Sequence, residues 1–412
     1  MASPTPFKVA IPQEKLDLLK QKLSLTSFPT ESSDVGWERG CPLADVQRLT
    51  KAWQTFDWRA AEAKLNEVPQ FTTPIGVDGF GEIDVHFVWQ RSSIKCAVPL
   101  LFVHGWPGSF IEVLKILPLL VDEARGEGPA FNIVAPSLPN FGFSQGVTIP
   151  GFGMAQYAEC FHKLMTKLGY GEYVTQGGDI GYSVTRALGL LYPKSCKASH
   201  INLIPISVPP TWSKNPLLAL RHAVSPYTEK EKKGLERSQW FEKEGRGYNL
   251  EQSTNPQTLA YALHDSPVAL LSWIYEKLHD WSDAYPWTDD EILTWVSIYR
   301  FSRAGPGAAH RIYYESNHNY VAAGRGLKIL NPVDMRSWLP IVKLGLSWNP
   351  KEIIVPPRML GRTLGSVVYE ADNESGGHFY AHERPEWLAR DLRTMFGKTG
   401  GAFGVVKGRE GY

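Results

Sequence analysis

A carboxylate lies where a sharp turn could expose it to a reactant. The short strand pattern Tyr173–Gln176 is followed at once by Gly177-Gly-Asp179-Ile-Gly181. Many hydrolases carry their nucleophile on such a strand-to-helix turn, with small residues two before and two after it. The central residue here is aspartate, where lipases have serine. An ordinary glycine-rich turn with a helix-capping aspartate is the alternative interpretation.

A histidine near the C-terminus and a glutamate before it could complete a catalytic triad. His378 follows two glycines in Gly376-Gly-His378-Phe379, and Glu352 follows the strand pattern Val342–Ser347. Hydrolases with this kind of turn run nucleophile, acid and histidine in chain order. We therefore expect Asp179 as nucleophile, His378 as base and Glu352 as acid, although a lone histidine is more often structural. Three other acids remain alternatives, but they follow the same strand as the histidine and reach its far ring nitrogen less easily: Glu370, Asp372 and Glu374.

Backbone amides could supply the oxyanion hole. His104-Gly-Trp106-Pro-Gly108 comes directly after the apolar run Val98–Val103. The amide of Trp106, together with the amide of Ile180 after the nucleophile, makes a donor pair for a developing oxyanion. The alternative is a simple turn rich in glycine and proline.

An aspartate nucleophile selects substitution at saturated carbon. A serine that attacked such a carbon would leave a stable ether, whereas a carboxylate leaves an alkyl ester on the enzyme. Water activated by the histidine can then attack the carbonyl of that ester. Asp179 therefore indicates epoxide opening or dehalogenation.

The leaving group separates these two reactions. An epoxide oxygen leaves as an alkoxide and needs hydrogen-bond donors such as tyrosine phenols, whose ordinary pKa is about 10. Tryptophan or asparagine N–H groups would suit a halide better. The composition of the later helical segment does not select among its tyrosines: Tyr248, Tyr261, Tyr275, Tyr285, Tyr299, Tyr313 and Tyr314.

The elements that must position these residues indicate an α/β protein. Apolar strand patterns at Val98–Val103 and Phe131–Ala135 alternate with helix patterns, which predicts a parallel sheet. We expect an α/β-hydrolase fold with an inserted helical cap and an N-terminal helical meander. The predicted divisions are a meander over 1–92, a core over 93–210, a cap over 211–335 and the rest of the core over 336–412.

Three longer helices are also expected from apolar spacing. The helical pattern of the meander runs from Leu43 to Leu65, and another follows the glycine-rich loop from Phe110 to Val121. In the cap, a third pattern extends from Leu259 to Leu278.

Composition and charge exclude several classes of protein. The 412 residues carry 43 Lys+Arg against 42 Asp+Glu, and the net charge of +1 gives no basic footprint for nucleic acid. The 12% of aromatic residues is enough to line large apolar pockets. Widely spaced cysteines predict free thiols rather than disulfides or a zinc site: Cys41, Cys96, Cys160 and Cys196.

No secretory signal or membrane span is expected. The first twelve residues contain no uninterrupted apolar segment, and no apolar run approaches the roughly 18–20 residues that cross a bilayer. We expect a soluble, cytoplasmic protein, with peripheral membrane association left open.

The chain resembles the microsomal-type epoxide hydrolases over nearly its whole length, and the soluble fungal members in particular. The resemblance rests on Phe56-Asp-Trp58, His104-Gly-Trp-Pro-Gly-Ser-Phe110, Pro139-Asn-Phe-Gly-Phe-Ser144, Gln176-Gly-Gly-Asp-Ile-Gly181, Ser266-Pro267, Trp273-Ile-Tyr-Glu-Lys277 and Gly376-Gly-His-Phe379. It implies that Tyr248 and Tyr313 activate the epoxide ring, with Tyr314 as the neighbouring alternative to Tyr313. A homodimer is also expected from the resemblance alone.

These features together predict an epoxide hydrolase that uses no cofactor and no metal. It would convert an apolar epoxide to a vicinal diol through an alkyl ester on Asp179, hydrolysed by water that His378 activates. Its partners would be the small epoxide and water, with no nucleic acid, while a second copy of the chain is left open. The alternatives are a haloalkane dehalogenase with the same triad and an inactive, hydrolase-like protein that binds an apolar ligand.

Overall fold

A nine-stranded sheet forms the centre of the molecule. The computed structural model describes residues 3–121, 128–205, 209–213 and 216–412. Its strands are ordered β1-β2-β3-β5-β4-β6-β7-β8-β9 across the sheet. Their bounds are β1 Thr5–Phe7, β2 Gln70–Val77, β3 Gly81–Gln90, β4 Val98–Val103, β5 Phe131–Pro136, β6 Tyr173–Gly177, β7 Cys196–Ile201, β8 Leu339–Trp348 and β9 Gly365–Asp372.

The pairing of neighbouring strands changes once across the sheet, from antiparallel to parallel. Strands β1, β2, β3 and β5 pair antiparallel, whereas every pair from β5 through β4 to β9 is parallel. All residues of β4, β5 and β6 are buried, so both faces of the parallel part are covered. The carboxyl ends of β4, β6 and β8 therefore meet at one edge of the sheet, where folds of this type place their sites.

Helices from two parts of the chain, residues 117–191 and 358–396, cover these strands. Helix α6 packs on β4, β6 and β7 and against α5, while α17 packs against α4 and β9. The bounds of these helices are α4 Leu117–Leu120, α5 Met154–Lys167, α6 Asp179–Leu191, α15 Arg358–Gly361, α16 Tyr380–Glu383 and α17 Pro385–Phe396.

A group of helices, here called the cap, lies between β7 and β8 in the sequence. Helix α9 packs on α13, and α11 packs on α10 and α12. The described part of this segment contains no strand. The cap helices are α7 Pro216–Val224, α8 Glu229–Trp240, α9 Gly247–Thr254, α10 Pro256–Asp265, α11 Pro267–Asp280, α12 Asp289–Arg300, α13 Arg311–Asn317 and α14 Tyr320–Gly324.

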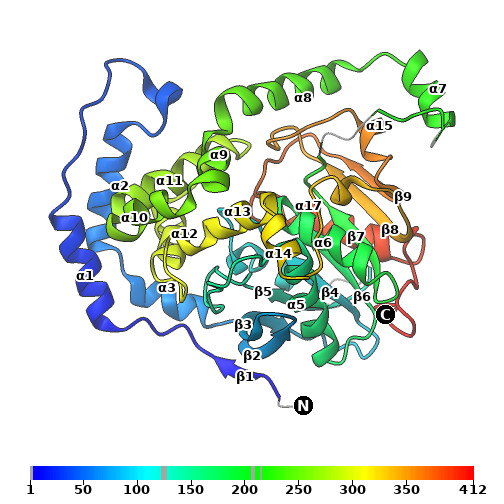
Figure 1. The fold of residues 1–412 in the computed structure, drawn as a ribbon, viewed down its shortest axis with the longest axis horizontal. Coiled ribbons are helices and arrows are strands. Elements are labelled where there is room, and N and C mark those ends of the chain that lie inside the picture. Colours follow the sequence, from blue (N-terminus) through cyan, green and yellow to red (C-terminus); the bar gives the residue numbers. More distant parts are fainter. Residues whose placement is uncertain (1–2, 122–127, 206–208, 214–215) are drawn as a thin grey trace.

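The N-terminal helices pack on the cap rather than on the sheet. Helices α1 (Gln13–Ser24) and α2 (Leu43–Thr55) both contact α11, and α2 also contacts α12. In Figure 1 the cap helices lie between these two helices and the parallel strands. The indole N–H of Trp53 in α2 donates to Ser297 Oγ in α12 at 3.2 Å. The meander and the cap therefore share a buried interface.

All three long helices expected from apolar spacing are broken, which corrects those predictions. The segment from Leu43 to Leu65 forms α2 and then α3 (Trp58–Leu65), because the Asp57 carboxylate accepts the Ala60 N–H at 3.0 Å and starts a new helix. The segment from Leu259 to Leu278 divides at Ser266-Pro267, since proline has no N–H to continue α10 and the serine hydroxyl caps α11.

The remaining differences concern short elements. The segment from Phe110 to Val121 forms a 3₁₀ turn, Phe110–Val113, and the short helix α4 instead of one helix. The alternating pattern Ile83–Trp89 predicts a strand and forms part of β3, but its hairpin partner β2 was not expected within the meander. Pro74 and Gly76 within β2 obscured its strand pattern.

Two further predictions concerned the state of the cysteines and the presence of a membrane-spanning helix. All four cysteines are free thiols, as their spacing predicts. Among the described residues, no helix combines the length and the apolar character that crossing a membrane requires.

Candidate active site

Asp179 occupies a strained turn between β6 and α6. As the first residue of α6 it has a φ of 48°, in the left-handed region that non-glycine residues rarely adopt. Such strain persists only where the surroundings fix it, and it concentrates at functional sites. Gly181 makes the tight turn possible, since a Cβ there would lie 2.0 Å from the Val103 carbonyl oxygen.

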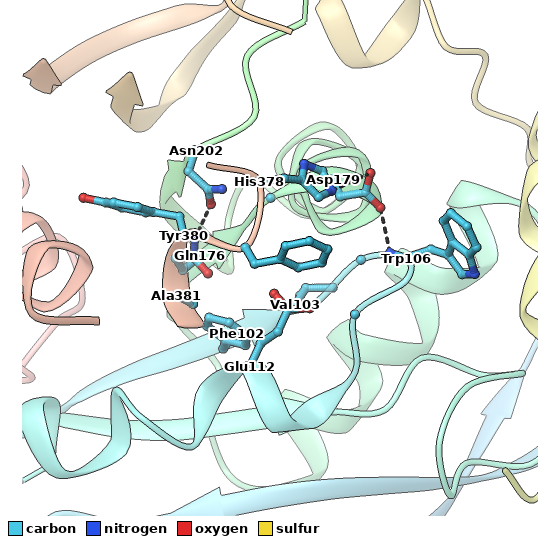
Figure 2. A pocket seen from close by; sticks show the side chains of 14 residues that line it. Phe102, Val103, Trp106, Glu112, Gln176, Asp179, Asn202, His378, Tyr380 and Ala381 are labelled. Carbon is cyan, nitrogen blue, oxygen red and sulfur yellow. Dashed lines mark hydrogen bonds and ion pairs between the residues drawn. The ribbon is translucent and has the colours of Figure 1, made fainter. Parts of the chain in front are cut away.

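The loop after β4 holds one oxygen of this carboxylate. The Trp106 N–H donates to Asp179 Oδ1 at 2.7 Å, as Figure 2 shows. Gly105 permits this approach, because a Cβ there would lie 2.3 Å from the same oxygen. Ile180 is the second residue of α6, and amides of the first helical turn have no partner within their helix. Both expected oxyanion donors thus belong to backbone next to Asp179.

His378 lies between Asp179 and Glu352. Its Nε2 is 3.5 Å from Asp179 Oδ2, and its Nδ1 is 2.5 Å from Glu352 Oε1. The histidine and the glutamate are both buried. The N–H of Ile353 also donates to Glu352 Oε1 at 2.7 Å and fixes the carboxylate. The three residues are thus connected in the order that a nucleophile, a base and an orienting acid require.

Electrostatics favour a protonated histidine while both acids are charged. Burial lowers the pKa of His378, but the Glu352 and Asp179 carboxylates outweigh it and raise that pKa well above its usual value. The imidazolium is thus stabilised as long as Asp179 remains a free carboxylate. Any reaction that neutralises Asp179 removes part of this stabilisation.

The competing acids make other contacts. Glu370 pairs with Arg362, whose Nη2 lies 2.6 Å from Oε2. Asp372 accepts a bond from Arg358 at 2.8 Å, and Glu374 is exposed. None of these three contacts His378 in the described structure, so Glu352 is the acid at its ring.

Two cap tyrosines face Asp179 across a cavity of about 480 Å³. The ring of Tyr248 in α9 stacks on Trp106, with centroids 4.9 Å apart and planes at 13°. The ring of Tyr313 in α13 meets Trp106 edge-on at 6.0 Å and 90°. The hydroxyls of Tyr248 and Tyr313 interact with each other, and the buried Tyr313 hydroxyl makes no other hydrogen bond to a described residue, so it can turn to a reactant in the cavity.

Tyr314 points elsewhere. Its ring stacks on His318 at 3.9 Å, and it does not line the cavity. Among the other cap tyrosines, Tyr261 is exposed, and the Tyr299 hydroxyl donates to the Gly108 carbonyl at 2.6 Å. Tyr285 bonds to Glu291 at 2.6 Å. Packing thus singles out the two tyrosines that the resemblance implies.

Both cavity phenols are held in the protonated form. Burial, together with the Asp179 charge, raises the pKa of Tyr248 well above its usual value. Burial does the same for Tyr313, with further contributions from Tyr248 and Asp179. At neutral pH each hydroxyl can therefore donate a hydrogen bond into the cavity.

Two residues at the site were missed by sequence reasoning. The Trp281 carbonyl accepts the His378 N–H at 2.8 Å, and its indole meets that ring edge-on at 4.9 Å. Nothing in its spacing indicated this role. Glu112 is partly buried and lines a pocket with Asp179 and His378, and its one signal is an acidic residue within the mostly apolar segment 110–121. In the described part of the chain, no group of three or more His, Cys, Asp or Glu residues is arranged to hold a metal.

Known proteins share both the sequence and this architecture. The family described as "Epoxide hydrolase N terminus" matches residues 4–113, and "alpha/beta hydrolase fold" matches residues 98–224. A putative epoxide hydrolase of Stigmatella aurantiaca is 39% identical over 402 residues, covering 95% of this chain and 84% of that protein. The chain belongs to the epoxide hydrolase family. Epoxide hydrolase 1 of Sus scrofa is 30% identical and covers 95% of this chain and 88% of its own length.

A solved structure extends this agreement to the fold. The Aspergillus niger epoxide hydrolase matches with a TM-score of 0.80 at 34% identity, covering 95% of each chain. The predicted α/β-hydrolase fold is therefore confirmed, and so is the predicted resemblance to epoxide hydrolases. The protein is an enzyme of this family, and its candidate site lies at the carboxyl edge of the sheet.

Proposed function

We propose that this epoxide hydrolase works through a covalent ester on Asp179. The observation that carries the proposal is the position of that carboxylate. One of its oxygens accepts the Trp106 amide, the other lies 3.5 Å from His378 Nε2, and the cavity beside it contains two phenols. A carboxylate so placed can attack a saturated carbon and leave an ester that water can cleave.

The first half of the reaction opens the ring. An Asp179 oxygen forms a bond to one oxirane carbon while the bond from that carbon to the ring oxygen breaks. Tyr248 and Tyr313 donate hydrogen bonds to the ring oxygen as it becomes an alkoxide. The alkoxide then takes up a proton, which the His378 imidazolium supplies through a tyrosine, and the product is a hydroxyalkyl ester.

Formation of the ester also prepares the base. The Asp179 charge helps to raise the pKa of His378, and an ester carries no charge. Esterification therefore lowers that pKa, so the imidazolium gives up its proton and becomes a neutral imidazole. A neutral imidazole is the form that can accept a proton from water.

The second half releases the diol. Water adds to Cγ of Asp179 while one of its protons passes to His378 Nε2, which Glu352 orients through Nδ1. The oxyanion forms on the ester carbonyl oxygen, held by the Trp106 and Ile180 amides. Collapse breaks the bond from Cγ to the alkyl oxygen, which takes the proton from His378. The vicinal diol leaves, and the proton that remains on the Asp179 carboxyl group passes to His378 Nε2, which restores the carboxylate and the imidazolium.

The cavity favours an apolar substrate of modest size. Its volume of about 480 Å³ lies in the usual range for small-molecule sites. Much of its wall is aliphatic or aromatic, including Met154, Leu203, Phe241, Ile312, Met335, Ile353 and Ile354. We therefore favour uncharged aliphatic or aryl epoxides over epoxides that carry a carboxylate near the ring.

A single turnover in ¹⁸O-water tests the ester. With enzyme in excess over styrene oxide, the diol should carry no label, and mass spectrometry of the peptide containing Asp179 should show one ¹⁸O. The Asp179→Ala variant is the control and should incorporate none. Label found in the diol of the first turnover would instead establish direct attack by water.

A panel of epoxides tests the substrate class. Diol formation should be fastest with styrene-type and aliphatic epoxides and much slower with epoxides of carboxylic acids. The opposite ranking would contradict the proposed apolar specificity while leaving the ester mechanism intact.

A further inference from the structure

Glu112 is a partly buried acid at the site that the steps above do not use. It lies in the 3₁₀ turn Phe110–Val113, directly after the loop that carries Trp106. Its carboxyl group packs against the backbone of Gly108, since a Cβ built there would lie 1.6 Å from Glu112 Oε1. Glycine at 108 thus leaves room for the carboxyl group to turn inward.

Glu112 lines a small chamber next to the reactive carboxylate. Asp179 and His378 line the same chamber, and Figure 2 shows these side chains around it. About 10 Å³ of the chamber is open to the centre of a water molecule, which is roughly the space that one water occupies. Asp179 also lines the large cavity that contains Tyr248 and Tyr313. The carboxylate therefore separates a space for an organic molecule from a space for water.

The side chain of Gln176 also lines the chamber, and one of its polar atoms lacks a hydrogen-bond partner. The amide nitrogen of Gln176 donates to Asn202 Oδ1 at 2.8 Å, a contact drawn in Figure 2. Its oxygen, Oε1, is buried and makes no hydrogen bond to any described residue. A buried acceptor is seldom left unsatisfied, and a water molecule commonly serves such a group.

We propose that this chamber holds the hydrolytic water and that Glu112 and Gln176 position it beside Cγ of Asp179. The proposal rests on the ester mechanism above. The water would accept a hydrogen bond from the Glu112 carboxyl group and donate to Gln176 Oε1 and His378 Nε2. On attack, the water oxygen bonds to Cγ and its proton passes to Nε2, so Glu112 neither gains nor loses a proton overall.

The protonation state of Glu112 suits this role. Burial raises its pKa to about 8; the His378 charge opposes the shift and the Asp179 charge adds to it. At neutral pH the group is therefore mainly a neutral carboxylic acid, able to donate to the water oxygen. A donor at that position leaves both water protons for Gln176 and His378.

Separate rates for the two half-reactions test the proposal. Glu112→Met removes the polar group at similar length, and Glu112→Gln keeps a donor. Stopped-flow tryptophan fluorescence with styrene oxide, calibrated by intact mass, gives the rates of ester formation and ester hydrolysis. For Glu112→Met we expect ester formation within about twofold of wild type and hydrolysis at least about tenfold slower, the loss of one hydrogen bond. Glu112→Gln should recover most of the hydrolysis rate.

A change on β6 provides an independent test. Gln176→Met removes the unpaired acceptor and should also slow hydrolysis selectively. The matched control is Thr175→Val, because the Thr175 hydroxyl bonds to Ser199 Oγ at 2.8 Å and does not line the chamber. This control should leave both rates unchanged. Should Glu112→Met fail to fold, Gln176→Met decides the question.

Three results have distinct meanings. Wild-type hydrolysis rates in Glu112→Met and Gln176→Met, or equal slowing of both half-reactions, would overturn the role of the chamber. Slow hydrolysis in Glu112→Met without recovery in Glu112→Gln would overturn the role of Glu112 as a donor. If wild-type enzyme forms diol without any ester, the ester mechanism itself fails, and the chamber proposal fails with it.

Discussion

The indole ring of Trp106 stacks on the phenol ring of Tyr248, with centroids 4.9 Å apart and planes at 13°. The same tryptophan donates its backbone N–H to Asp179 Oδ1 at 2.7 Å. One residue of the core thus positions both the carboxylate and a tyrosine of the cap. The position of the Tyr248 phenol relative to the Asp179 carboxylate is therefore set by direct packing between core and cap.

Removing either phenol should slow ring opening. Tyr248→Phe and Tyr313→Phe keep the rings but remove the hydroxyls that bind the developing alkoxide. We expect each to lower the rate of ester formation about 10- to 100-fold, and the double variant to lose nearly all activity. Tyr314→Phe is the matched control and should behave as wild type, because its ring stacks on His318 outside the cavity. Equal effects at 313 and 314, measured by single-turnover kinetics, would contradict this assignment.

Neutralising Glu352 should trap the ester. Glu352→Gln keeps the shape of the side chain but removes the charge that raises the pKa of His378 and orients its ring. We expect ester hydrolysis to slow by about 100-fold or more, so that intact mass spectrometry detects alkylated enzyme at steady state. Glu370→Gln, which alters an acid paired with Arg362, should accumulate no ester. Rapid turnover of Glu352→Gln without ester would exclude Glu352 as the orienting acid.

A methyl group at position 105 should disable the site. The Cβ of Gly105→Ala would lie 2.3 Å from Asp179 Oδ1, so the carboxylate or the loop must shift. We expect at least about a 100-fold loss of kcat/KM and a destabilisation of about 1–3 kcal/mol. Gly171→Ala is the control, since no atom lies within 4 Å of its Cβ and its φ is not positive. Wild-type kinetics for Gly105→Ala would show that the loop tolerates displacement.

Buried histidines should make the fold sensitive to acid. Burial lowers the pKa of His86 and of His310 from 6.5 to about 3. The unfolded chain therefore binds protons below pH 6.5 that the folded protein does not. Each such histidine should reduce the free energy of unfolding by about 1.4 kcal/mol per pH unit as the pH falls from about 6.5 toward 3, and should have no effect above pH 6.5.

Unfolding measurements between pH 8 and pH 5 check this expectation. His310→Leu should reduce the loss of stability per pH unit, because one of the neutral buried rings is gone. His264→Asn should leave the slope unchanged, since His264 is exposed. A slope in His310→Leu equal to that of wild type would mean that His310 is not held neutral.

The parallel strands were predictable because their residues carry an unambiguous pattern. Val98–Val103 is wholly apolar, and the strand β4 has these same bounds. Strand β2 was not predictable, because its proline and glycine resemble a turn. Strand β1 has only three residues, too few to show a pattern. The break between α2 and α3 depends on one capping carboxylate, which composition alone does not separate from a surface acid.

At the candidate site, the sequence predicted some residues and could not predict others. The turn around Asp179 has a local signature that is weak by itself, and the prediction there also depended on the order of Asp179, Glu352 and His378 along the chain. The choice between Tyr313 and Tyr314 did not follow from spacing, since neighbours on a helix point about 100° apart and only packing determines which one faces the core. Glu112 was missed for a related reason: the groups beside it come from β6, α6 and the loop before α16, far apart in the sequence.

The contacts of the N-terminal helices bear on how a substrate enters. Helices α1 and α2 lie against α11 and α12 of the cap, while β1 and β2 of the same segment extend the central sheet. Two ion pairs, Lys22–Asp265 and Arg48–Asp289, cross from this segment to the cap at 2.5 Å. The N-terminal segment therefore links the cap to the central sheet. We expect reactants to enter by local movement of side chains and cap loops, because a hinge opening of the whole cap would have to break these contacts.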